Sequence, residues 1–147
     1  MRVRRMSSIA AVGAAAVICA AAPSTAATPT VHFSRIQYDA PGKDTSANVN
    51  GEYVKITNSK SYTENLKGWT VRDKAGHVYT FGSYSLPAGH SLWLYSGKGR
   101  DSGANLYWGS GWHIWNNTGD TAYLRNGRGT SIDTCSWPKD GAGYTNC

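Results

Sequence analysis

The stretch GEYVKITN, residues 51–58, decides the fold class because polar and apolar side chains alternate along it. Val54 and Ile56 share one face of the expected strand, whereas Lys55 and Thr57 share the other. A period of two residues is typical of a strand with one face in the core and one face outside it. The stretch therefore predicts a half-buried β-strand.

Apolar side chains recur with the same period on both sides of this stretch. Leu92 and Leu94 are expected to face the core, which places Trp93 and Tyr95 on the opposite face. After the N-terminal segment, the sequence lacks the 3.6-residue period of a helix. We predict strands at Val31–Tyr38, Glu52–Asn58, Trp69–Asp73, His77–Phe81, Ser91–Ser96, Trp112–Trp115, Thr121–Asn126 and Thr130–Cys135. This pattern favours an all-β, immunoglobulin-like β-sandwich of about seven to nine strands.

Two of the expected turns have the chemistry of a β-hairpin. DKAG at residues 73–76 and NGRG at residues 126–129 contain glycine, which adopts the positive φ angles of tight turns. The longest stretches without a strand pattern are Asp39–Gly51 and Gly97–Gly111. Long loops often carry the binding residues of a sandwich, so both are candidate parts of a site.

The N-terminus has the three parts of a secretory signal peptide. Basic MRVRR at residues 1–5 precedes an alanine-rich apolar run at residues 9–22, and small residues follow up to Ala27. The apolar run is shorter than the roughly 20 residues of a membrane anchor. We predict that residues 1–27 are removed, after Ala27 or one residue earlier, and that the mature chain is secreted and has no membrane span.

The predicted mature chain, residues 28–147, has a length typical of one domain. Without the three arginines of the signal, 12 basic residues face 9 acidic ones, which gives a net charge of +3 instead of +6. The Lys and Arg residues are scattered singly, so charge alone gives little support for a polyanionic partner. We expect a monomer without a cofactor.

The cysteines of the chain fall into two groups. Cys19 lies in the predicted signal, and lipid attachment there is opposed by Ile18, which stands where a lipidation signal needs a small residue. Cys135 and Cys147 remain in the mature chain, where an oxidising environment favours their pairing. The predicted disulfide ties the last residue to the final expected strand.

Three motifs resemble those of a lamin tail domain: GEYVxIxN at residues 51–58, LKGW at residues 66–69 and WNNxGDTAxL at residues 115–124. The resemblance implies an immunoglobulin-like sandwich, in agreement with the strand pattern. The export signal and the lack of a coiled-coil rod in this sequence make it more similar to stand-alone bacterial members than to nuclear lamins. We interpret the matched positions as fold determinants: Glu52, Tyr53, Val54, Gly68, Trp69, Trp115, Asn116, Asn117, Gly119 and Asp120.

Side chains that could support catalysis or metal binding are dispersed. The histidines have no metal-binding spacing and are expected at the surface or at strand ends; they are His32, His77, His90 and His113. Ser110 lies in GSG and not in a GxSxG nucleophile elbow. We predict a non-enzymatic module without a metal. The alternative is a small secreted hydrolase whose carboxylates converge in the fold, with Glu52, Asp101 and Asp120 as candidates.

The strongest functional signal is a surplus of aromatic residues. Tyrosine and tryptophan side chains form stacking platforms and anchor protein interfaces. The predicted binding residues are Trp93, Tyr95, Tyr107, Trp108 and Trp112. In a purely structural interpretation, Trp69 and Trp115 fill the core while Trp108 and Trp112 cover one end of the sandwich. The expected partner is an extracellular protein, a surface polymer or a carbohydrate, and single-stranded nucleic acid is an alternative.

Overall fold

The computed structural model describes residues 18–23, 27 and 30–147. The predicted signal peptide, residues 1–27, lies mostly outside the described residues. Within the described part of the chain, no helix has the length and apolarity needed to cross a membrane.

One sheet has five strands in the order β11-β1-β2-β7-β8. Its strands are β1 (Val31–Gln37), β2 (Tyr53–Asn58), β7 (Ser91–Tyr95), β8 (Asn105–Tyr107) and β11 (Tyr144–Asn146). Neighbouring strands are antiparallel except β7 and β8, which are parallel. A bulge between Phe33 and Arg35 interrupts the alternation of β1, so that Ser34 and Arg35 both lie outside the core.

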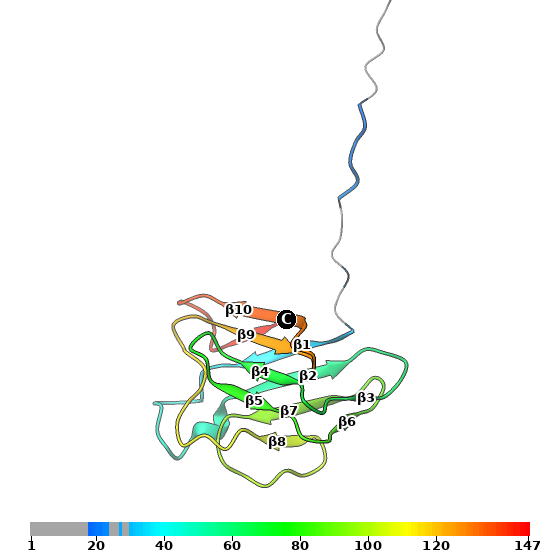
Figure 1. The fold of residues 1–147 in the computed structure, drawn as a ribbon. Helices are drawn as coiled ribbons and strands as arrows, with labels where there is room; N and C mark the ends of the chain where they lie inside the picture. The colour runs from blue at the N-terminus through cyan, green and yellow to red at the C-terminus, as the bar shows by residue number, and fades with distance from the viewer. Residues whose placement is uncertain (1–17, 24–26, 28–29) are drawn as a thin grey trace, which may run out of the picture.

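The second sheet has four antiparallel strands in the order β10-β9-β4-β5. Its strands are β4 (Thr70–Arg72), β5 (Val78–Thr80), β9 (Asp120–Arg125) and β10 (Ser131–Trp137). Two short strands, β3 (Glu64–Asn65) and β6 (Ser85–Leu86), pair with each other, and a 3-10 turn, η1, spans Val49–Gly51. Figure 1 shows the two larger sheets stacked as the layers of a sandwich.

The core lies between the two sheets and is filled from both. Ile56 and Leu94 from the five-stranded sheet and Val71 and Leu124 from the four-stranded sheet are all buried. Each of these residues alternates with a side chain on the outside of its sheet, as the sequence period requires. The all-β, immunoglobulin-like sandwich is therefore confirmed.

The predicted strand at Trp112–Trp115 is wrong, because this segment is an irregular loop that precedes β9. Its backbone N–H groups at Ile114 and Trp115 bond to the side chain of Glu52 and not to a neighbouring strand. Four strands of two or three residues, β3, β6, β8 and β11, fall outside the predicted set. Runs this short contain too few alternations to be distinguished from loops.

The predicted disulfide between Cys135 and Cys147 is confirmed. It joins β10 of one sheet to the residue that follows β11 of the other. The bond therefore fastens the C-terminal edge strand across the open side of the sandwich.

Candidate functional site

The fold separates the five predicted binding residues into three places. Trp93, Tyr95 and Tyr107 lie together on the outer side of the five-stranded sheet. Trp108 is half-buried and its ring packs against Trp115, with centroids 5.9 Å apart. Trp112 is 55% exposed and borders a cleft at one end of the sandwich. The aromatic residues of the Gly97–Gly111 region and its flanks thus do not form one platform.

The first candidate surface is the outer side of β1, β2, β7 and β8, which we call the aromatic face. Strand register places Tyr53, Tyr95 and Tyr107 in one row across three strands. The Tyr95 and Tyr107 rings stack with centroids 5.3 Å apart, and the Tyr53 ring meets Tyr95 edge-on at 5.8 Å. Burial, followed by the proximity of the other two phenols, raises the pKa of Tyr95. Its hydroxyl therefore stays protonated and can donate a hydrogen bond.

Next to the tyrosine row lies a row with two cations and an indole. Register aligns Arg35, Lys55 and Trp93 across β1, β2 and β7. The Lys55 Nζ atom lies 5.1 Å from the Trp93 ring centroid, and the Arg35 guanidinium lies 3.9 Å above the ring of Tyr144 on β11. Among the described residues, neither Arg35 nor Lys55 forms an ion pair.

A third row on the aromatic face consists of hydroxyl side chains. The Thr57 Oγ1 atom lies 2.8 Å from the Oγ atoms of both Ser34 and Ser91. The side chains that point outward on these four strands include no carboxylate; they are His32, Ser34, Arg35, Gln37, Tyr53, Lys55, Thr57, Ser91, Trp93, Tyr95, Asn105 and Tyr107. The aromatic face is therefore a sheet surface of hydroxyl groups, rings and cations without ion-pair partners.

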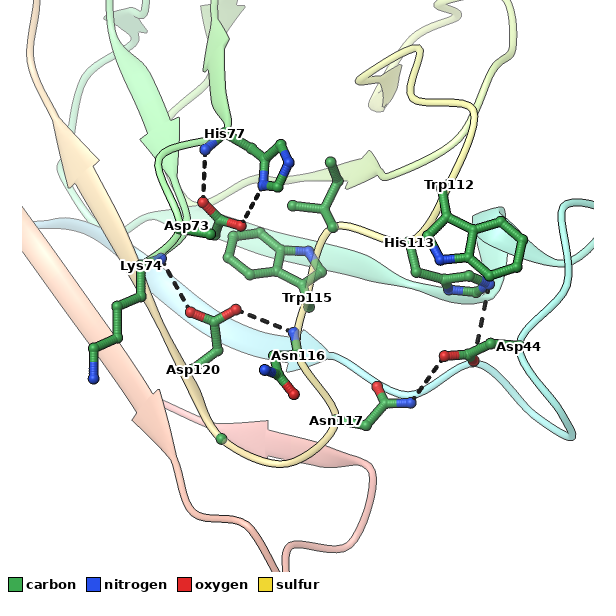
Figure 2. Close-up of a pocket in the computed structure, with 13 residues that line it drawn as sticks. Asp44, Asp73, Lys74, His77, Trp112, His113, Trp115, Asn116, Asn117 and Asp120 are labelled. Atoms are coloured by element: carbon green, nitrogen blue, oxygen red, sulfur yellow. Dashed lines mark hydrogen bonds and ion pairs between the residues drawn. The ribbon is translucent and has the colours of Figure 1, made fainter.

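The second candidate surface is a cleft of about 480 Å³ between the turn at residues 73–77 and the loop at residues 112–119, which we call the end cleft. Figure 2 shows Asp73 and His77 on one side of it and Trp112 on the other. Asp73 is buried, and its Oδ1 atom accepts hydrogen bonds from the backbone N–H groups of Gly76 and His77. Its Oδ2 atom lies 2.6 Å from His77 Nδ1, which orients the imidazole.

The loop behind the end cleft is anchored by Glu52, which is fully buried. Its Oε2 atom accepts backbone hydrogen bonds from Ile114 and Trp115, at 3.0 and 3.4 Å, and its Oε1 atom lies 2.9 Å from His113 Nδ1. Desolvation raises the pKa of Glu52, while the Ile114 N–H and the His113 ring act in the opposite direction. The carboxylate is thus structural, although its charge is costly to bury.

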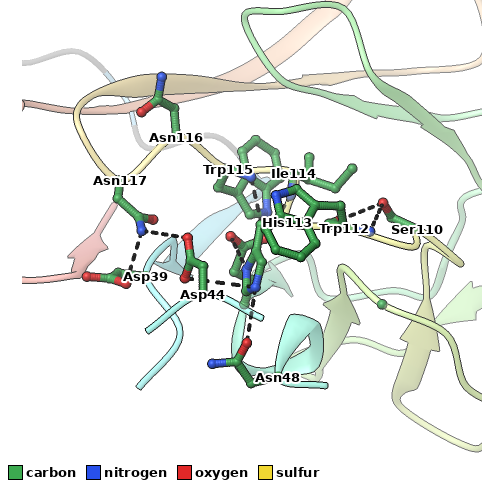
Figure 3. A network of polar contacts seen from close by, with 12 residues as sticks. Asp39, Asp44, Asn48, Ser110, Trp112, His113, Ile114, Trp115, Asn116 and Asn117 are labelled. Atoms are coloured by element: carbon green, nitrogen blue, oxygen red, sulfur yellow. Dashed lines mark hydrogen bonds and ion pairs between the residues drawn. The ribbon is translucent and has the colours of Figure 1, made fainter. Parts of the chain in front are cut away.

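The other nitrogen of His113 connects this loop to the Asp39–Gly51 loop. His113 Nε2 lies 3.1 Å from the Thr45 carbonyl oxygen. It also lies 3.2 Å from Asn48 Oδ1 (Figure 3). The orientation of the Asn48 amide is fixed because its Nδ2 donates to the carbonyl oxygens of Lys43 and Pro41. Both ring nitrogens of His113 therefore lie within hydrogen-bond distance of oxygen atoms, and the ring links Glu52 to the Asp39–Gly51 loop.

The remaining polar residues around the end cleft also hold loops. Asp120 accepts backbone hydrogen bonds from Lys74 and Thr121 with Oδ1 and from Asn116 with Oδ2. The Asn117 side-chain amide donates to Asp39 and to Asp44, at 3.1 Å each. These contacts are consistent with the prediction that Asn117 and Asp120 are fold determinants.

The other predicted fold determinants occupy core and turn positions. Val54, Trp69 and Trp115 are buried in the core. Gly68 and Gly119 have φ angles of 78° and 114°, which favour glycine. Tyr53 differs from the rest because its half-buried ring lies on the aromatic face.

Catalytic chemistry finds little support in the arrangement of these groups. Among the described residues, the exposed His77 Nε2 atom has no hydrogen bond to a nucleophile, and no three His, Cys, Asp or Glu side chains gather as a metal site. The three hydrolase candidates are each already engaged: Glu52 is buried, Asp120 holds three N–H groups and Asp101 accepts from Tyr107 N.

One expectation from the sequence is wrong at this end of the molecule. His113 was expected at the surface or a strand end, but only 4% of its side chain is exposed. His77, which lines the end cleft, agrees with the expected surface position, because 57% of its side chain is exposed. Glu52 and His113 lie 61 positions apart in the sequence, and no local pattern links them. The one hint of this contact in the sequence is that Glu52, an acidic residue, stands directly before the strand at residues 53–58.

A comparison with protein families supplies the decisive observation. The family model of the lamin tail domain matches residues 24–139, which is most of the chain. The chain belongs to the lamin tail domain family. A comparison with curated proteins gives no match. As a lamin tail domain, the chain is an immunoglobulin-like module, and this is compatible with a non-catalytic binding or structural role.

Proposed function

We propose that this lamin tail domain is exported and acts as a non-catalytic module that binds an extracellular polymer or protein partner through its aromatic face. The observation that carries the proposal is the alignment of Trp93, Tyr95 and Tyr107 with two cations on one regular sheet surface. The sheet already holds these rings in fixed positions, so binding a partner costs little further conformational entropy. The end cleft is less suited to binding, because most of its polar groups already hold loops.

Export is supported by the N-terminal pattern and by the disulfide between Cys135 and Cys147, which is typical of an oxidising compartment. N-terminal sequencing of the protein recovered from culture medium tests this part. We expect the mature chain to begin at Thr28, or one residue earlier. Recovery of the intact chain, Met1 included, only from the cytoplasm would contradict export.

Binding is tested with the purified mature chain and the isolated cell envelope of the producing organism. We expect the wild type to co-sediment with the envelope and a Trp93→Ala/Tyr95→Ala variant to remain in solution. Tyr62→Ala is the matched control, because Tyr62 is 59% exposed and lies outside the aromatic face. Equal retention of all three proteins, with circular dichroism showing each of them folded, would remove the aromatic face as the binding surface.

A further inference from the structure

We infer that the ligand of the aromatic face is an acidic polysaccharide whose hydroxyl groups bond to the tyrosine and hydroxyl rows while its carboxylates pair with Arg35 and Lys55. The inference rests on the proposed function and specifies the chemical class of its partner. It follows from three properties of the face: phenol hydroxyl groups that bond to no other protein atom, rings that contact one another, and cations without counter-ions.

Hydroxyl groups dominate the polar chemistry of this face. Among the described residues, the phenol groups of Tyr53, Tyr95 and Tyr107 form no hydrogen bond to another protein atom. Phenol hydroxyls both donate and accept, as do the hydroxyls of a sugar. Ser34, Thr57 and Ser91 add a second row, which strand register places on the other side of the cation row.

The faces of the tyrosine rings are largely occupied. Tyr95 and Tyr107 stack on each other, and Gly99 lies so close to the Tyr107 ring that an added Cβ atom would overlap it. Proteins that bind single-stranded nucleic acids hold the bases chiefly by stacking them on the open faces of aromatic rings. The tyrosine row offers its hydroxyl edges instead, which favours a polyol over a base.

The positive charges on the aromatic face favour a negatively charged ligand. Arg35 and Lys55 have no ion-pair partner among the described residues, and the side chains that point outward on these strands include no carboxylate. Both cations are held by rings, Tyr144 and Trp93, so their positions are defined. The Arg35 Nη2 atom donates to Gln37 Oε1 at 3.3 Å, a neutral partner that leaves the positive charge without a counter-ion. A guanidinium forms charge-assisted hydrogen bonds with a carboxylate. A carboxylate-bearing polymer would neutralise this row.

Isothermal titration calorimetry with uronic-acid oligomers tests the inference. The probes are oligogalacturonate, alginate and hyaluronan oligosaccharides, each alongside its methyl ester, which keeps the sugar chain and removes the charge. We expect at least one acid to bind and its ester to bind at least about tenfold more weakly. A twelve-residue oligothymidylate is the nucleic-acid probe.

Two variants and one control locate the site. Arg35→Gln/Lys55→Gln removes the charges, and Tyr53→Phe/Tyr95→Phe/Tyr107→Phe removes only the hydroxyls; each should weaken acid binding about tenfold or more. Lys67→Gln/Arg128→Gln removes two exposed positive charges elsewhere and should leave the affinity within about twofold.

The outcomes separate this inference from the proposed function. Equal binding of acids and esters, lost in the face variants, overturns the acidic class and leaves the aromatic face as a binding surface. Binding of oligothymidylate with no binding of the acids also overturns the inference, as does no binding of any probe. The proposed function fails only if the envelope experiment shows the same retention for the wild type and the Trp93→Ala/Tyr95→Ala variant.

Discussion

The polar side chains of the end cleft and those of the aromatic face are used in opposite ways. At the end cleft, the carboxylates of Glu52, Asp73 and Asp120 are occupied by backbone N–H groups of the surrounding loops. On the aromatic face, Arg35 and Lys55 have no ion-pair partner among the described residues. A polar side chain is available to a ligand only where the fold has not already satisfied its polar atoms.

The difference follows from the backbone beneath each surface. The loops at the cleft have N–H groups without a strand neighbour, and burial makes an unpaired N–H group costly. Acidic side chains supply the missing acceptors. On the aromatic face, the sheet ladder satisfies the backbone of β1, β2 and β7, so the backbone there needs no acceptor from the side chains. The comparison therefore predicts that substitutions at the cleft change stability, whereas substitutions on the face change binding.

Removal of the buried anchor should have the largest effect. Glu52→Ala leaves the N–H groups of Ile114 and Trp115 and the ring of His113 without an acceptor in the interior. We expect a loss of about 3–5 kcal/mol in the free energy of unfolding, measured by urea denaturation with tryptophan fluorescence. A loss below about 1 kcal/mol would contradict the structural role given to Glu52.

Loss of the disulfide should rank second. Cys135→Ser/Cys147→Ser frees a short loop in the unfolded state and should cost about 3 kcal/mol in unfolding free energy. It also releases β11, whose Tyr144 lies under Arg35, so the substitution tests whether this edge strand supports the aromatic face. The measurement is urea denaturation of the oxidised wild type and the variant. Equal midpoints would show that β11 is held without the bond.

The pH dependence of stability should show the cost of burying the Glu52 charge. Its pKa is raised from the ordinary value of 4.5 in the folded protein, so the folded state holds the proton more tightly than the unfolded state. This stabilisation is complete below the unfolded pKa and is lost as pH rises through the folded pKa.

Glu52→Gln removes the titration, so the stability of the wild type relative to the variant should fall with increasing pH. The fall is about 1.4 kcal/mol for each unit by which the pKa is raised. Urea midpoints measured from pH 4 to pH 8 test this expectation, and a constant difference between the two proteins would contradict it.

A smaller effect is expected at the turn that bears His77. Asp73→Asn keeps the acceptor for the N–H groups of Gly76 and His77 but loses the charge that orients the imidazole. We expect a loss of about 1–2 kcal/mol in unfolding free energy. The His77 ring resonances, followed by NMR, should also broaden or shift as the ring gains freedom. An unchanged ring environment would show that Asp73 does not position it.

The smallest effects on stability should come from the exposed ring of Trp112 and from the tyrosine hydroxyls of the aromatic face. Trp112→Ala at the cleft and the triple tyrosine-to-phenylalanine variant on the face should each change the unfolding free energy by less than about 0.5–1 kcal/mol. Thermal melts followed by circular dichroism provide the measurement. If the triple variant unfolded as readily as Glu52→Ala, the hydroxyls would be structural, and the contrast between the two regions would disappear.

The sequence was sufficient where a local pattern repeats. Alternation around Val54 and Leu94 predicted the strands, their buried faces and the sandwich, because the side-chain direction in a strand has a fixed period of two. The same alternation placed Trp93 and Tyr95 on the outside. It failed at Trp112–Trp115, where closely spaced aromatic residues suggested a strand but the backbone bonds to Glu52 instead.

By itself, the sequence determined the fold class, the paired cysteines and which faces of the long strands are buried, because each of these depends on residue type and spacing within a short segment. The tertiary structure alone decided that Glu52 meets His113 and that Arg35, Lys55 and Trp93 form one row. These residues lie tens of positions apart, and only strand register and loop packing bring them together. The hydrogen-bond partners of a polar side chain often come from distant parts of the sequence. Only the tertiary structure therefore shows which polar groups anchor loops and which remain free to bind a ligand.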